Sequence, residues 1–219
     1  MSTTPSQILN QAKLVLSKLE DMGMNDVQST DTWQSRKNLL QLITGTVAQE
    51  SNFEHRRQMG FPDITKPFQL SEPEREDLSG QGINPDRILA GAFGYVQFEV
   101  ATARDFFINW RRLNQPSQYW DGLSRVWFGT EVPWFMPSAP MLAYFLQHHD
   151  QFALAMMRFR YQRVPDSLPP ADDIEALAAY WKQFYNTEFG RGLTEEFVSN
   201  WNRYLEHLDL DWEKPPEDG

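Results

Sequence analysis

Cysteine is absent from this chain of 219 residues, so disulfide bonds and thiolate-bound zinc are excluded. The four histidines are His55, His148, His149 and His207. They show neither the H-E-x-x-H pattern nor any other spacing typical of metal ligands. We therefore expect no metal and no cofactor.

Long apolar runs and basic clusters are missing as well. No window approaches the roughly 18 consecutive apolar residues that a membrane span needs. Residues 1–20 lack a basic start followed by an apolar run, so we expect no signal peptide and synthesis in a cytoplasm. The net charge of −10, without a dominant Lys/Arg cluster, argues against nucleic acid as a partner and disfavours purely electrostatic binding to anionic surfaces.

Helical periodicity dominates what is present. Hydrophobic residues make up 41% of the chain, which is typical of a globular protein, and alternating strand patterns are scarce, so the predicted fold is mainly α. The spacing predicts helices at 6–21, from about 32 to 51, 99–113, 141–161, from about 173 onward, and from 194. Residues 60–85 carry many Pro, Gly and acidic residues and are predicted to be a long irregular segment.

The organisation along the chain follows from these patterns. We expect an N-terminal helix (residues 1–30) packed on a core domain (31–208), and an acidic, Pro-rich tail (209–219). No internal repeat is present.

One carboxylate interrupts an apolar helix face. Leu39, Ile43 and Val47 form a stripe, and Glu50 is the next position on that face. Packing of the stripe would partly desolvate the carboxylate, which raises its pKa toward the range of a general acid. The alternative is a helix-end residue that turns to solvent or pairs with Arg56 or Arg57.

Three short segments carry a resemblance to a known family. Residues 47–53 (VAQESNF) resemble the Glu-Ser helix end of lytic transglycosylases and goose-type lysozymes. Residues 91–104 (GAFGYVQFEVATAR) resemble their G-A-x-G-L-M-Q-x-x-P-x-T-A-R segment, and residues 185–187 (YNT) resemble their Tyr-Asn motif. The three occur in the family's order and cover the core from about residue 35 to 205. The resemblance implies a lysozyme-like helical fold with a long irregular insertion between the first two segments.

A closer resemblance is to lysozyme-like proteins of tailed bacteriophages. It rests on residues 56–58 (RRQ), 97–99 (QFE), 157–158 (MR) with Tyr161, and 180–187 (YWKQFYNT). It implies a phage product that is associated with the virion or with lysis, acts at the bacterial cell wall and has other virion proteins as partners. The chain departs from the broader family in its longer gap after Glu50 and in Val100, where a Pro is common.

The resemblance implies cleavage of the β-1,4 bond between N-acetylmuramic acid and N-acetylglucosamine in a peptidoglycan glycan strand. Glu50 would protonate the leaving oxygen through an oxocarbenium-like transition state. In a transglycosylase, the same residue would then accept the proton of the muramoyl 6-hydroxyl and no second carboxylate is needed. In a hydrolase, a second acid positions water. Glu99 is the candidate, with a role at the start of a helix as its alternative.

The resemblance also implies supporting residues, each with a structural alternative. Ser51 would orient Glu50, or merely end the helix; Tyr185 would tune Glu50, or merely pack in the core. Gln97 would bind a sugar, and Asn186 would contact a sugar or cap a helix. The remaining candidates for substrate binding or support are Gln58, Gly94 and Tyr95.

These patterns favour a peptidoglycan-cleaving enzyme, with transglycosylase preferred to hydrolase. The rival is a structural virion component that keeps the lysozyme-like fold without activity, which the acidic charge and the lack of a signal peptide favour. A third hypothesis is a noncatalytic glycan-binding module. Anhydro ends in the products would indicate a transglycosylase, and reducing ends a hydrolase. Fixed stoichiometry in purified particles without clearing of cell-wall suspensions would indicate the virion component. Binding to sacculi without product release would indicate the glycan-binding module.

Overall fold

The computed structural model describes residues 4–21, 32–54, 63–65, 70–82, 84–85, 88–112, 124, 137–186 and 190–211. It is mainly helical, as predicted, with one two-stranded sheet among these residues. Two compact units are distinguished. The first combines Met1–Phe53 with Met157–Gly219, and the second is Glu54–Met156. The boundaries expected at residues 30 and 208 divide the chain differently and stay a prediction.

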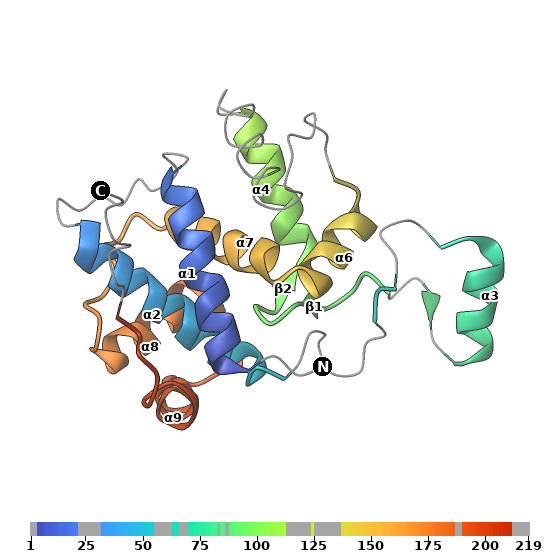
Figure 1. Cartoon of the computed structure of the whole chain (residues 1–219). Helices are drawn as coiled ribbons and strands as arrows, with labels where there is room; N and C mark the ends of the chain where they lie inside the picture. Colours follow the sequence, from blue (N-terminus) through green and yellow to red (C-terminus); the bar gives the residue numbers. More distant parts are fainter. Residues whose placement is uncertain are drawn as a thin grey trace. The chain divides into compact units, whose positions relative to one another are not determined.

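In the first unit, helix α2 (Thr32–Ser51) lies at the centre, and α1 (Pro5–Asp21) packs against it (Figure 1). Every residue from 39 to 48 of α2 is buried. Helix α1 begins at a reciprocal cap, because the Gln7 N–H bonds the Thr4 hydroxyl and the Thr4 N–H bonds the Gln7 side chain. It buries a stripe at helical spacing, as predicted: Ile8, Leu9, Ala12, Val15, Leu16 and Leu19.

Two later helices complete this unit around α2. Helix α8 (Ile174–Trp181) begins where the Asp173 carboxylate accepts the Ala176 N–H at 3.0 Å, and it continues into the π-helix η2 (Lys182–Asn186). Helix α9 (Thr194–Tyr204) buries Phe197 and Trp201. Both α8 and α9 contact α2. The helices predicted at 6–21, 32–51 and from 173 and 194 onward are confirmed.

The second unit contains the sheet. Strands β1 (Ala92–Phe93) and β2 (Phe98–Glu99) form an antiparallel hairpin that leads into α4 (Val100–Arg112). Helix α6 (Ala139–His148) contacts both β1 and α4. The hairpin was not predicted, and the helix expected from Glu99 begins one residue later because Glu99 pairs with Ala92.

One expected helix is in fact two. The periodicity predicts a single helix over 141–161, but α6 ends at His148 and α7 runs over Asp150–Gln162. His149 between them is extended, with φ −120° and ψ 95°. The end of α6 holds another segment: Gln147 bonds the Ile64 N–H at 2.9 Å and the Asp63 carboxylate at 2.8 Å. Contacts between residues so far apart in the sequence cannot be predicted from helical periodicity.

The segment 60–85 was predicted to be wholly irregular, and this prediction was wrong for its middle. Helix α3 covers Glu72–Gly80. Ser71 and Glu74 form its capping box, and Pro73 occupies the first turn, where its missing N–H leaves no helical bond unmade. The proline and acidic residues that predicted an irregular segment are therefore the signals that start a short helix. This helix has no buried residue.

Candidate active site

Glu50 lies in the last turn of α2, and the chain leaves the helix immediately after it. Ser51 ends the helix, and Asn52 (φ 52°) and Phe53 (φ 59°) both adopt left-handed backbone. Val47 and Ala48, in the turn before, are fully buried, and Glu50 is partly buried. The predicted position of Glu50 at the margin of an apolar helix face is therefore confirmed.

Trp181 fixes the Glu50 carboxylate. The indole Nε1–H donates a hydrogen bond of 2.9 Å to Glu50 Oε1. An indole can only donate, so Oε1 must act as the acceptor whether the carboxyl group is charged or neutral. The acidic proton, when present, therefore sits on Oε2. The described residues offer Oε2 no partner, so it is the atom from which a proton can leave.

The environment makes Glu50 a weak acid. Burial disfavours the charged form and raises the pKa of Glu50 from 4.5 to about 7, against the opposing effects of the Trp181 hydrogen bond and of the Arg160 charge. No described cation lies within ion-pair distance of this carboxylate. A carboxylic acid that keeps its proton near neutral pH matches the requirement for a general acid.

Arg160 of α7 and the π-helix η2 lie near Glu50 and contact each other. The Arg160 guanidinium donates to the Tyr185 carbonyl at 2.7 Å and lies 4.6 Å from the centre of the Tyr185 ring. The wider spacing of a π-helix changes which carbonyls remain free, and such segments are frequent at functional sites. Arg160 thus holds η2 in place while its charge acts on Glu50.

Tyr185 and Tyr161 line the same region. Burial and the Glu50 charge raise the pKa of both phenols above the usual value. Their rings are 5.6 Å apart, and the Tyr161 hydroxyl is 2.7 Å from the hydroxyl of Thr46, one helical turn before Glu50. Both phenols therefore stay neutral, as polar groups beside the acid. Tyr185 is 7% exposed, so its expected packing in the core is confirmed, and its role in tuning Glu50 stays a prediction.

The second sequence segment forms a separate structure in the second unit. The hairpin turn puts Gly94 at φ +71°, and a Cβ there would collide with the Leu146 carbonyl, so only glycine fits. Gln97 closes the turn, because its backbone N–H and its side chain both bond the Gly94 carbonyl, at 3.1 and 2.9 Å. Tyr95 is 2% exposed and Glu99 is exposed. Their roles toward a sugar or a water stay predictions.

The remaining candidates have local contacts. The Ser51 hydroxyl bonds the Val47 carbonyl at 3.0 Å, so the expected hydrogen bond from Ser51 to Glu50 is not found. Asn186 Oδ1 accepts a hydrogen bond of 2.8 Å from the Lys182 ammonium, which also donates to the Gly190 carbonyl, so Asn186 has a local contact within η2. Gln58, together with Arg56 and Arg57, lies outside the described residues.

Comparisons with protein families, with curated proteins and with solved structures find no match to this chain. The case for the site therefore rests on its geometry. In the part of the chain that the structure describes, no three His, Asp or Glu side chains gather as a metal site would require, and no helix has the length and apolarity to cross a bilayer.

Sequence reasoning missed two residues of the site. The helical spacing of Trp181 predicts a core position, and the residue is 1% exposed, yet its single polar atom contacts Glu50. Arg160 was not singled out. A signal was available for Trp181, because it precedes Tyr185 by one helical turn on the same face.

Proposed function

We propose that this protein cleaves peptidoglycan glycan strands, with Glu50 as the general acid. The observation that carries the proposal is a partly buried carboxyl group with a pKa of about 7, held through one oxygen by Trp181 and free at the other. The resemblance of three short segments to lytic transglycosylases and goose-type lysozymes supplies the substrate class. The phage origin and a place in the virion belong to the same proposal.

In the proposed reaction, Oε2 of Glu50 delivers its proton to the glycosidic oxygen as the bond to the muramoyl C1 breaks. The carboxylate left behind accepts the Trp181 hydrogen bond, which strengthens when the acceptor is charged. Arg160 stabilises the same charge at longer range. Glu50 then recovers a proton, from the muramoyl 6-hydroxyl in a transglycosylase or from an attacking water in a hydrolase.

The transglycosylase route is preferred because it requires only this one carboxylate. We expect purified sacculi to yield products with 1,6-anhydro ends, detected by mass spectrometry of the released muropeptides. Reducing ends would assign a hydrolase and make Glu99 the residue to replace next.

The Glu50→Gln variant tests the role of the acid. It preserves the oxygen that accepts from Trp181 but has no acidic proton, so cleavage should fall by at least about 100-fold, the scale of general acid catalysis. Glu206→Gln, at an exposed position, is the control and should keep full activity. If parent and Glu50→Gln release equal amounts of product, Glu50 is not the acid. If neither releases any, the silent virion component becomes the better hypothesis.

A further inference from the structure

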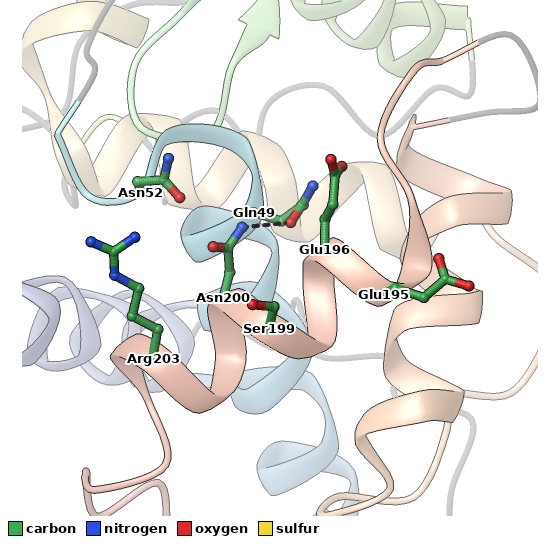
Figure 2. Close-up of a pocket in the computed structure, with 7 residues that line it drawn as sticks. All are labelled: Gln49, Asn52, Glu195, Glu196, Ser199, Asn200 and Arg203. Atoms are coloured by element: carbon green, nitrogen blue, oxygen red, sulfur yellow. Dashed lines mark hydrogen bonds between the residues drawn. The ribbon is translucent and has the colours of Figure 1, made fainter.

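A polar hollow lies in the first unit, and Glu50 is not among the residues that line it. Its volume is about 480 Å³, within the range of small-ligand sites. Figure 2 shows side chains of α9 and of the end of α2 around it. The lining residues are Gln49, Asn52, Glu195, Glu196, Ser199, Asn200 and Arg203.

The register of α9 makes one of its faces polar over two turns. Glu196, Ser199, Asn200 and Arg203 are spaced as positions i, i+3, i+4 and i+7, so they lie on the same side of the helix. Phe197 and Trp201, on another side, are buried. At 1.5 Å per residue, Glu196 and Arg203 are about 10 Å apart along the helix. The hollow therefore has a negative end and a positive end.

Neither end is neutralised by an ion pair among the described residues. Arg203 has no carboxylate partner there, and its guanidinium carbon lies 5.0 Å from the centre of the Tyr204 ring. Glu196 accepts one backbone hydrogen bond, from Leu193 N–H, through Oε2 alone. In Figure 2 the two charged groups stand at opposite ends of the hollow. Charges left apart in this way are available to a ligand.

The floor between the two ends is made of amides. Asn200 Nδ2 donates to Gln49 Oε1 at 2.8 Å, which leaves the Gln49 amide hydrogens and the Asn200 oxygen unused within the described structure. Asn52 Oδ1 is buried and has no hydrogen-bond partner there. An unsatisfied buried acceptor is rare and calls for a donor from outside the chain. The floor thus offers paired donors and acceptors, the pattern that recognises peptide groups.

We propose that this hollow binds a short peptide that carries a carboxylate and an ammonium group about 10 Å apart. The carboxylate pairs with Arg203, the ammonium group pairs with Glu196 and Glu195, and the intervening peptide groups bond Gln49, Asn200 and Asn52.

The inference deepens, and rests on, the proposed function when the peptide is the stem of peptidoglycan. A stem peptide combines free carboxylates with the amino group of a diamino acid, so its charges fit both ends of the hollow. An ordinary peptide segment has the same chemistry. The experiment therefore has to separate the two sources.

The test is isothermal titration of the full chain with N-acetyl-L-Ala-γ-D-Glu-L-Lys-D-Ala. We expect saturable binding that weakens about tenfold when the peptide's C-terminus is amidated or its lysine is acetylated, which corresponds to about 1.4 kcal/mol for each charged contact. Arg203→Gln should weaken binding similarly and remove the effect of amidation, and Glu196→Gln should do the same for lysine acetylation. Arg104→Gln, on exposed α4 surface, is the matched control.

Three results would overturn the inference or part of it. No saturable binding, or binding that Arg203→Gln and Glu196→Gln leave unchanged, removes the peptide site. Equal affinity for the all-L, α-linked peptide of the same sequence keeps the site and overturns the wall as its source. Because binding is measured without cleavage, the inference and the proposed function fail separately: peptide binding by a protein that releases no product contradicts only the enzyme.

Discussion

At the scale of single residues, the site depends on one acid whose proton is held by burial. Glu50 would titrate at 4.5 in the unfolded chain and titrates at about 7 in the folded one. A raised carboxyl pKa means that the folded state binds the proton more tightly, so the contribution to stability is complete below pH 4.5 and is lost as the pH rises toward 7. The Glu50 side chain therefore destabilises the fold most in alkaline solution.

The Glu50→Gln variant should reveal this loss. Glutamine imitates the neutral acid at every pH, so parent and variant should have equal free energies of unfolding well below pH 4.5, at about pH 3, where Glu50 is protonated in both the folded and the unfolded state. Above pH 7 the variant should be more stable, by an amount of the order of 3 kcal/mol at about 1.4 kcal/mol per pH unit. Urea denaturation at the two pH values measures it. A difference that does not change with pH would mean that Glu50 is not protonated in the folded state.

The Trp181 hydrogen bond can be tested through the pH profile of activity. This bond lowers the pKa of Glu50, so Trp181→Phe should raise it further, and the alkaline limb of kcat/KM should move up by about one pH unit. Trp201→Phe, also in the core but without a bond to Glu50, is the control for lost volume. A purely structural role for Trp181 would lower activity at all pH values and leave the limb in place.

At the scale of elements, helical periodicity predicted those helices that bury a continuous stripe. Helices α1, α2 and α9 follow the spacing of their apolar residues closely because burial of those residues stabilises each helix. Helix α3 and the end of α6 are different. Capping residues define where α3 begins. At the end of α6, Gln147 contacts residues 63 and 64, which are far away in the sequence. Likewise, spacing located Glu50 but could not locate Trp181 Nε1, because one polar atom on a core residue does not alter the pattern.

The packing of α2 on α9 depends on Gly45. A Cβ at this position would lie 2.5 Å from Phe197 Cζ and 3.0 Å from the Trp201 ring. We expect Gly45→Ala to destabilise the fold by about 1–3 kcal/mol through overpacking, despite the better helix propensity of alanine. Gly80→Ala is the matched control, because nothing lies within 4 Å of its added Cβ at the exposed end of α3. Equal urea midpoints for the two variants would contradict the tight contact.

At the scale of the whole molecule, the charge of the chain sets how it meets its proposed substrate. The net charge is −10, and peptidoglycan in a wall carries carboxylates of the same sign. Repulsion between like charges lowers the rate of encounter over a distance set by salt, about 30 Å at 0.01 M and about 10 Å at 0.1 M. Unlike a basic wall enzyme, this protein gains no attraction that salt could weaken.

Its activity on sacculi should therefore rise several-fold between about 0.01 and 0.1 M NaCl, measured as the release of soluble muropeptides, because screening removes the repulsion. A chitooligosaccharide, which is uncharged, should be cleaved at a rate that does not change over the same range if it is accepted as a substrate. A fall in activity on sacculi with added salt would show that a local basic surface, not the net charge, governs the encounter. The Arg203→Gln variant would then show whether the positive end of the α9 hollow is that surface, since removing it should abolish the dependence on salt.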